Sequence, residues 1–362
     1  MTIQDLHFDC VHFRGDIPCR PNKQSGMTCP NCMEYQPISK RILIIKLGAL
    51  GDVIRTTPLI EAYRKLYPGC HITWITTYPD VLPANSIDSI RTFSFEDVFI
   101  VTKQSFDIAI NLCKDAEAAI LLAECNAIEK RGFIWNDGHV DIANTESEHK
   151  FMTGLFDQYS KANTKSYLQE IFEICGLKYD NESYVLNVEQ RLLDSFSHIK
   201  KDASNKIIIG LNTGAGSRWP TRLWPIEHWK QLINMLQADG YAPLLLGGPD
   251  EHEVNTMLRQ ETGAMYVGSY PVEQFMAIVS QADVILTAVS MTMHIALGLG
   301  KKMVLFNNIF NKHEFDVFGL VEIVEPSTGC ECYYGTVCSR SISCMHDITV
   351  EQVYQAIIRQ LQ

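Results

Sequence analysis

The sequence lacks several features that would each define a class of protein. No stretch of the 362 residues holds 18 uncharged apolar residues, so no membrane-spanning helix is predicted. The first residues show no basic segment followed by an apolar one, so we expect no secretory signal and a cytoplasmic protein. Basic residues are few: 31 Lys and Arg against 42 Asp and Glu give a net charge of −11. This charge argues against a nucleic-acid partner and against a broad polybasic membrane patch.

Three nucleotide-binding signatures are also missing. No glycine turn has the G-x-G-x-x-G spacing of a dinucleotide fingerprint, and none continues into the G-K-[ST] of a P-loop. No aspartates have the D-x-D spacing with which many sugar-nucleotide enzymes hold a diphosphate through Mg²⁺. The absent fingerprint disfavours a nicotinamide-dependent oxidoreductase. A diphosphate bound here would have to be neutralised by arginines and a helix N-terminus.

Short apolar strands alternate with amphipathic helices along most of the chain, and the pattern restarts after a polar stretch at 178–205. Such alternation is typical of βαβ units with parallel sheets. We expect two Rossmann-like halves whose strands direct their carboxyl ends toward one cleft. The expected strands are 41–46, 71–76, 106–112, 130–135, 206–212, 242–246, 283–287 and 301–306, and the expected helices are 52–67, 116–125, 148–160, 167–175, 226–239, 272–281, 291–299 and 349–361.

The first chemically informative segment is Lys46-Leu-Gly-Ala-Leu-Gly-Asp-Val-Ile-Arg-Thr-Thr-Pro58, in which a strand ends in a glycine turn and a helix begins. Asp52 falls in the first helical turn, where the helix dipole favours a carboxylate in any protein. The same position also suits a general base at a strand's carboxyl end. We expect an acceptor to approach over this turn, beside Gly48, Gly51 and Arg55.

The second half holds a glycine-rich loop after the strand at 206–212, with Thr213, Gly214, Ser217, Arg218 and Arg222 as candidate donor-binding residues. Backbone N–H groups of such loops bind phosphate, and arginine matches phosphate oxygens with two N–H groups. The alternative is a long polar loop without a ligand.

Two further turns complete the candidate donor site. Gly248, Asp250 and Glu251 follow the strand at 242–246, where carboxylates often bind ribose hydroxyls, although the segment is equally suited to a plain turn. A third strand-to-helix turn carries Ser290, Thr292 and His294. Ser290 is a candidate N-cap, and N–H groups at such a helix start attract a diphosphate. His294 is either a structural residue or a phosphate contact.

Together these segments resemble the ADP-heptose:lipopolysaccharide heptosyltransferases, glycosyltransferase family nine, over about residues 41–362. The order of several motifs makes the resemblance more specific than any single one. The stretches that carry it are Ile-Leu-Ile-Ile-Lys-Leu-Gly-Ala-Leu-Gly-Asp-Val-Ile-Arg-Thr-Thr-Pro-Leu, Gly-Leu-Asn-Thr-Gly-Ala-Gly-Ser-Arg-Trp-Pro, Leu-Leu-Leu-Gly-Gly-Pro-Asp-Glu and Cys-Met-His-Asp-Ile-Thr-Val-Glu-Gln-Val.

The resemblance implies a GT-B fold and an inverting, metal-independent transfer of heptose from ADP-heptose to a hydroxyl of a lipopolysaccharide-type or other glycan. It implies Asp52 as the base that deprotonates the acceptor, Arg222 as a contact of the donor phosphates, and Asp250 or Glu251 as the ribose carboxylate. It places Ser290, Thr292 and His294 in a second loop that binds phosphate and sugar. In that loop many members carry Asp-Thr-Gly where this chain has Val289-Ser-Met, which leaves the exact donor sugar open.

Two alternatives remain open. The segment Phe306–Phe315 is similar to heptosyltransferases that modify autotransporter proteins, so a protein could replace the glycan acceptor. Val289 and the many cysteines also suit a nucleotide-binding regulator built on a transferase scaffold. Peripheral contact with the inner membrane and oligomerisation are left open as well.

Cysteines gather at both ends of the chain. The first forty residues hold Cys10, Cys19, Cys29 and Cys32, and the last crossover holds Cys330, Cys332, Cys338 and Cys344. In a reducing compartment such sets are typical of structural Zn or Fe sites, because four thiolates fill a tetrahedral ion and leave no catalytic position. We therefore predict four parts: a metal module at 1–40, an acceptor domain at 41–190, a donor-nucleotide domain at 191–325, and a cysteine-rich segment with a terminal helix at 326–362.

Overall fold

The first half of the chain is built on a largely parallel sheet with the strand order β3-β2-β1-β4-β5-β6. The computed structural model describes residues 1–216 and 218–362. Only the pairing of β5 with β6, among the described residues of this sheet, is antiparallel. The strands are β1 (Arg41–Ile45), β2 (His71–Thr76), β3 (Ser89–Thr92), β4 (Ser105–Asn111), β5 (Asn126–Asn136) and β6 (His139–Ile142).

Helices cover both faces of this sheet, which explains the uninterrupted apolar run of its central strand β1. Ile42 to Ile45 are all fully buried, with alternate side chains entering the clusters on opposite faces. The helices of this half are α2 (Leu50–Thr56), α3 (Pro58–Leu66), α4 (Phe95–Lys103), α5 (Ala116–Glu124), α6 (Glu148–Leu155), α7 (Asp157–Ala162) and α8 (Tyr167–Ile174).

Two predicted helices prove to be interrupted. The expected helix at 52–67 consists of α2 and α3, because Pro58 has no N–H to continue the first helix and instead begins the second. The expected helix at 148–160 consists of α6 and α7, with Phe156 in an extended conformation between them. The sequence patterns also failed to predict β3, α4, β6, the strand at Val321–Val324 and the helix at His252–Thr262. For α4 a signal was present, because Ser94 caps this helix by accepting from the backbone N–H of Asp97.

The second half contains a parallel sheet with the strand order β11-β10-β9-β7-β8. The last helix of the chain returns to pack on this half, where the indole N–H of Trp224 donates to the carbonyl of Ile348 just before it. The strands are β7 (Ile208–Asn212), β8 (Ala242–Leu246), β9 (Val284–Ala288), β10 (Lys302–Phe306) and β11 (Val321–Val324), and the helices are α9 (Gln190–Ser195), α10 (His198–Asp202), α11 (Ile226–Ala238), α12 (His252–Thr262), α13 (Val272–Ser280), α14 (Met291–Gly298) and α15 (Val350–Leu361).

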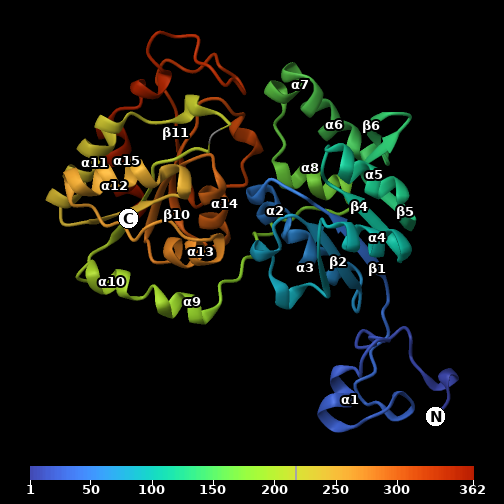
Figure 1. Ribbon diagram of the computed structural model, residues 1–362. Coiled ribbons are helices and arrows are strands. Elements are labelled where there is room, and N and C mark those ends of the chain that lie inside the picture. Colours follow the sequence, from blue (N-terminus) through green and yellow to red (C-terminus); the bar gives the residue numbers. More distant parts are fainter. Residues whose placement is uncertain (217) are drawn as a thin grey trace.

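The two halves meet at the carboxyl ends of their central strands (Figure 1). Helix α2, which follows β1, packs against α14, which follows β9. The expectation that both sheets direct their carboxyl ends toward a common region is confirmed. No helix within the described ranges combines the length and apolar character needed to cross a bilayer.

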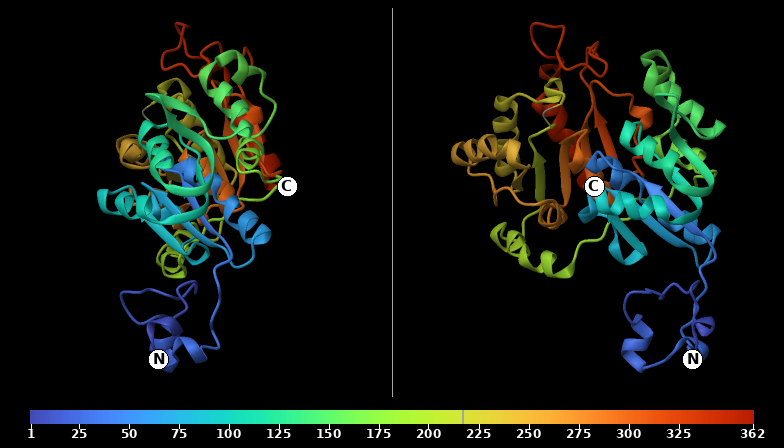
Figure 2. Two further views of the ribbon diagram at one scale, coloured as in Figure 1. Left: turned by 90° about the vertical axis from the view of Figure 1, so that its right-hand side faces the viewer. Right: turned by 45° about the vertical axis from the view of Figure 1, so that its right-hand side comes forward.

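Residues 1–38 lie apart from both sheets, as Figures 1 and 2 show, and include the short helix α1 (Arg20–Ser25). Ser39 attaches this segment to the first half by donating its N–H to Gly69 and its hydroxyl to Pro68. Within residues 1–40, all of which are described, Pro21 is the only buried residue. The segment therefore folds without a hydrophobic core of its own.

Candidate active site

A carboxylate between two cations lies at the carboxyl end of β1. Helix α2 places Asp52 in its first turn, with Oδ1 2.9 Å from Nη2 of Arg55 one turn later. Oδ2 lies 3.6 Å from Nζ of Lys46, the residue that follows β1. The Asp52 side chain keeps 33% of its surface exposed, whereas Lys46 is almost completely buried. Asp52 is therefore accessible to a ligand, whereas Lys46 is buried beside Asp52.

The ion pairs fix the protonation state of this group. Burial by itself would raise the pKa of Asp52, but Arg55, then Lys46 and His294, hold it well below its ordinary value. Burial likewise disfavours the charged forms of Lys46 and Arg55, and neighbouring groups, including Asp52, raise the pKa of each above its ordinary value. At physiological pH all three groups are charged, so Asp52 is an ionised carboxylate that can accept a proton, although its lowered pKa makes it a weak base.

The sequence patterns missed the groups that support this site. The guanidinium of Arg55 lies 3.3 Å from the ring centroid of Tyr167, a favourable cation–π arrangement. Its Nε is buried without a hydrogen-bond partner among the described residues. The sequence did contain a signal that Lys46 belongs to the site, because a lysine directly after four apolar strand residues is expected to be buried and to need an anionic partner. Nothing in the spacing indicated Tyr167.

His294 lies at the contact between the halves. Its ring packs on Gly51, and a β-carbon built at Gly51 would come within 2.5 Å of Cδ2 of the imidazole. Burial, and then the charge of Arg55, lower the pKa of His294 to about 3, so the ring is neutral. Its Nδ1 is buried and makes no hydrogen bond within the described part of the chain. The structure thus places His294 beside Asp52.

Arg222 joins the two loops predicted to bind a diphosphate. Its guanidinium donates to the carbonyl of Ala215, in the loop after β7, and to that of Val289, in the loop after β9. It is 6% exposed, and it forms no ion pair with any described residue. Burial lowers the pKa of Arg222 to about 10, which still leaves it charged at neutral pH. A buried cation without a counter-ion is suited to an anionic ligand.

The loops after β7 and β8 are also in contact. Glu251 accepts from the N–H of Gly248 at 2.8 Å, and its carboxylate occupies the space that a side chain at Gly214 would need. The hydroxyl of Thr213 donates to Asn255 at 2.7 Å. Asp250 is exposed. Of the two candidate ribose carboxylates, Glu251 is therefore the one that touches the predicted phosphate loop.

The other predicted donor residues have varied surroundings. Ser290 occupies the N-cap position of α14, and its hydroxyl contacts Thr287 instead of capping a helical N–H in the described structure. Thr292 donates to Asn212 at 3.1 Å. Arg218 is exposed, with Cζ 4.4 Å from the ring of Trp219, and the predicted residue Ser217 lies outside the described residues. Gly48 precedes α2, next to Tyr78.

The sequence model of "Glycosyltransferase family 9 (heptosyltransferase)" matches residues 100–314, more than half of the chain. The chain belongs to glycosyltransferase family 9. Lipooligosaccharide heptosyltransferase 2 of Haemophilus influenzae is 21% identical over 287 residues, which cover 73% of this chain and 82% of that protein. These matches confirm the predicted family and identify the chain as a glycosyltransferase.

Solved structures of this family share the fold. A family 9 glycosyltransferase from Veillonella parvula superposes with a TM-score of 0.69 and 20% identity, covering 90% of this chain and 98% of that one. TibC of enterotoxigenic E. coli, a dodecameric iron-containing heptosyltransferase in complex with ADP-D-β-D-heptose, has a TM-score of 0.54 and 15% identity, covering 93% of this chain and 82% of that chain. The predicted α/β glycosyltransferase fold with Rossmann-like sheets is confirmed at this level.

In this family 9 glycosyltransferase the two sets of cysteines remain separate. Cys10, Cys19, Cys29 and Cys32 line one small cavity together with His7 and His12. Cys330, Cys332, Cys338 and Cys344 are neighbours near the end of the chain. Burial and contact with Cys344 raise the pKa of the Cys330 thiol, whereas hydrogen bonds with Ser339, Cys338 and Cys330 lower the pKa of the Cys332 thiol. No group of three or more His, Cys, Asp or Glu side chains in the described residues has a geometry that would hold a metal ion.

Proposed function

We propose that this enzyme transfers a heptose from ADP-heptose to a hydroxyl of a lipopolysaccharide-type glycan, with inversion at the anomeric carbon and Asp52 as the general base. The observation that carries the proposal is the ionised Asp52 carboxylate, partly exposed, at the contact between the two halves. The likeness to a lipooligosaccharide heptosyltransferase supports the sugar and the acceptor class.

The donor would bind to the second half. Arg222, a buried cation that touches the loops after β7 and β9, would neutralise the diphosphate together with the N-terminal N–H groups of α14. Glu251 would accept hydrogen bonds from the ribose, as carboxylates at this position of Rossmann-like halves do. Thr213, Gly214 and Gly248 would line the same nucleotide. TibC, whose structure contains ADP-D-β-D-heptose, supports this choice of donor.

The reaction would be a single displacement. The acceptor oxygen attacks the anomeric carbon, its proton passes to Asp52, and the bond between the anomeric carbon and the diphosphate oxygen breaks. ADP leaves with the electron pair, and Arg222 stabilises the additional charge. The cations beside Asp52 make it a weak base, but the acceptor hydroxyl becomes strongly acidic as its oxygen bonds to carbon, so a weak base suffices.

Substitution of Asp52 tests the proposal. Asp52→Asn keeps the shape of the side chain but cannot take a proton, so the transfer rate should fall roughly 100- to 10,000-fold. The affinity for ADP, measured by calorimetry, should stay within about threefold, because Asp52 belongs to the other half. Asp52→Glu, which retains a carboxylate, should recover part of the rate. Normal turnover by Asp52→Asn would refute the assignment of the base.

We propose in addition that both four-cysteine sets bind structural Zn or Fe. In residues 1–40 the four cysteines line one cavity, in a segment without an apolar core, so a metal would supply the folding free energy. In the second set the N–H of Cys332 donates to Sγ of Cys330, and that of Ser339 to Sγ of Cys332, each at 3.4 Å. These are the bonds that stabilise coordinated thiolates. The iron in TibC supports a metal in a relative of this fold.

Elemental analysis of the purified protein tests the metal proposal. Two sites predict about two equivalents of Zn or Fe for each chain. Cys29→Ser should remove one equivalent and Cys338→Ser the other, because each tetrahedral ion needs four thiolates. Absence of both metals from freshly purified, reduced protein would refute the proposal.

A further inference from the structure

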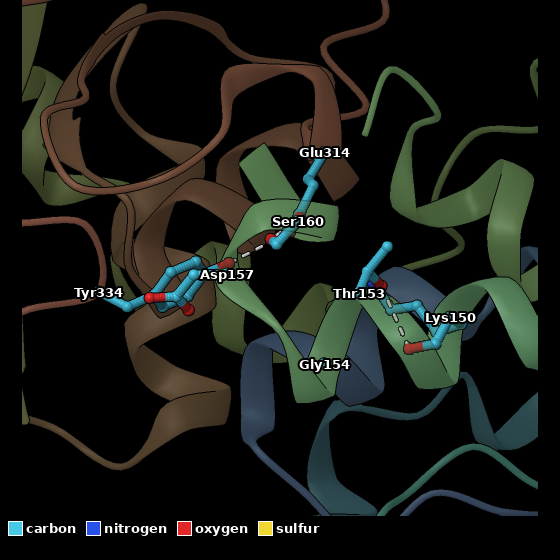
Figure 3. Close-up of a pocket in the computed structure, with 7 residues that line it drawn as sticks. All are labelled: Lys150, Thr153, Gly154, Asp157, Ser160, Glu314 and Tyr334. Atoms are coloured by element: carbon cyan, nitrogen blue, oxygen red, sulfur yellow. Dashed lines mark hydrogen bonds between the residues drawn. The ribbon is translucent and has the colours of Figure 1, made fainter. Parts of the chain in front are cut away.

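A polar cavity of about 200 Å³ lies between the two halves, outside the residues assigned so far (Figure 3). Helices α6 and α7 of the first half contribute Lys150, Thr153, Asp157 and Ser160. The second half contributes Glu314 and Tyr334. Its volume is below the roughly 300–1,000 Å³ of sites for drug-sized ligands, so it suits a small polar group such as one sugar ring.

Hydrogen bonds across the two halves form one wall of this cavity. The hydroxyl of Ser160 donates to Oε1 of Glu314 at 3.2 Å and lies 2.7 Å from the hydroxyl of Tyr333. Tyr334 donates to the other carboxylate oxygen of Glu314 at 3.3 Å. Asn311 donates to the carbonyl of Ser160 at 2.8 Å. The cavity is complete only when the two halves are in contact, as expected for the place where donor and acceptor meet.

The charges of the cavity favour hydroxyl donors. Glu314 and Asp157 form no ion pair within the described residues. Each oxygen of Glu314 already accepts one hydrogen bond and retains a second lone pair for an O–H group. Lys150 is neutralised by the buried carboxylate of Glu170 at 2.6 Å. Lys114 lies behind Gly154 and donates to the carbonyls of α6, not into the cavity.

The cavity adjoins the proposed base. Lys150, which lines the cavity, lies 5.0 Å from the ring centroid of Tyr167, and the guanidinium of Arg55 lies 3.3 Å from the same centroid. That guanidinium in turn contacts Asp52 at 2.9 Å. A ligand held by Glu314 would lie near the group that takes the proton.

We infer that this cavity binds the acceptor as a neutral, polyhydroxylated sugar residue. The inference rests on the proposed function and specifies its acceptor class. Glu314 and Asp157 would accept from sugar hydroxyls, and two carboxylates without cation partners would repel an acidic sugar. The helices that form most of the lining belong to the half that carries Asp52, whereas Arg222 and the other donor residues belong to the opposite half. The occupant is therefore the acceptor and not the donor heptose.

Matched glycosides test the inference on the intact protein. Methyl α-glucoside, methyl α-mannoside and methyl α-galactoside are compared with the corresponding methyl uronides, in which a carboxylate replaces the CH₂OH group. Saturation-transfer NMR in the presence of ADP should show binding of at least one neutral glycoside, about tenfold stronger than its uronide. Stronger binding of the uronides would overturn the inference, and so would binding of neither set by protein that binds ADP normally.

Variants locate the binding in the cavity. Glu314→Gln and Asp157→Asn should each weaken the neutral glycoside about tenfold, because a hydrogen bond to a charged group is lost, and should reduce discrimination against the uronide. Glu148→Gln, an exposed carboxylate at the start of α6 that does not line the cavity, is the matched control and should have no effect. Unchanged binding in both cavity variants would overturn the inference.

A separate readout distinguishes failure of the inference from failure of the proposed function. ADP affinity and the slow, acceptor-independent hydrolysis of ADP-heptose report on the donor site alone. Both should be unchanged in the control variant Glu148→Gln, whose side chain is exposed and does not line the cavity. If the wild-type protein neither binds nor hydrolyses ADP-heptose, the proposed function fails, whatever the glycosides show.

Discussion

The imidazole of His294 occupies the position that a side chain at Gly51 would need, although the two residues belong to different halves of the molecule. Gly51 lies in the first turn of α2, directly before Asp52, and His294 lies in α14. A tight contact between the halves therefore lies next to the proposed base. The position of one half relative to the other depends on a glycine in this turn.

Gly51→Ala should separate the halves slightly. The new methyl group would overlap Cδ2 of His294, and overpacking of this kind typically costs roughly 1–3 kcal/mol. We expect a lower melting temperature and a reduced transfer rate, with unchanged affinity for ADP. The double variant Gly51→Ala/His294→Ala removes the overlap and should recover stability relative to Gly51→Ala. Additive effects of the two substitutions in thermal unfolding would contradict the contact.

The neutral state of His294 predicts a particular pH dependence of stability. In the folded protein the pKa of His294 is about 3, and in the unfolded chain it is near 6.5. Between these pH values only the unfolded chain binds the proton. The contribution of His294 to the free energy of unfolding therefore falls by about 1.4 kcal/mol for each unit of decrease in pH. Thermal unfolding between pH 4.5 and 6.5 measures the slope.

His294→Gln should make this slope shallower. His71 and His228, whose pKa values are also lowered by burial, should retain a residual slope in the variant. Asp52 does not interfere in this window, because its lowered pKa gives stability that is lost only below the ordinary value near 3.8. Equal slopes in the two proteins would show that folding does not change the protonation of His294, and would contradict its lowered pKa.

Arg222 and Arg218 lie in one loop region but should differ in their effect on the donor. Arg222→Gln removes a buried cation and should weaken ADP binding about tenfold or more, the loss expected for a charged hydrogen bond. Arg222→Lys should recover only part of the affinity, since a compact ammonium lacks the planar fork with which Nη1 and Nη2 of the guanidinium reach two separate carbonyls. Arg218→Gln, at an exposed position, is the control and should have the smaller effect in calorimetry.

The N-terminal segment should unfold independently of the transferase. Cys29→Ser/Cys32→Ser should make residues 1–38 sensitive to proteases while the main melting transition and ADP binding stay unchanged, because the attachment runs through Ser39. Cys125→Ala, in the core of the first half, is the control and should leave protease sensitivity of the segment unchanged. A common loss of both parts would show that they fold as one unit.

The alternation of strands and helices was predictable because each central strand is buried on both faces and so leaves a continuous apolar run, as in β1. The elements that escaped prediction lie at sheet edges or on the surface. The residues of β3 are only half-buried, and α12 exposes most of its polar face, so neither leaves a clear apolar period. Pro58 was visible in the sequence, but its effect depends on the register of the helix around it.

Prediction of the site succeeded where a motif follows a strand and failed where side chains meet across the fold. Asp52 and Arg222 follow β1 and β7 in recognisable patterns. Tyr167, which stacks on Arg55, and Glu314, which bonds to Ser160, lie more than one hundred residues from their partners. A period or spacing reports only local geometry, so it cannot indicate such pairs.

The N-terminal segment joins the first half at the amino end of β1, whereas Asp52 lies beyond its carboxyl end. A protein immobilised through this segment on a sensor surface would therefore present the contact region of its two halves to the solution. Donor and acceptor binding could be followed on such a surface without obstruction by the support. The same geometry would let a docking partner recruit the enzyme through its N-terminal segment during turnover.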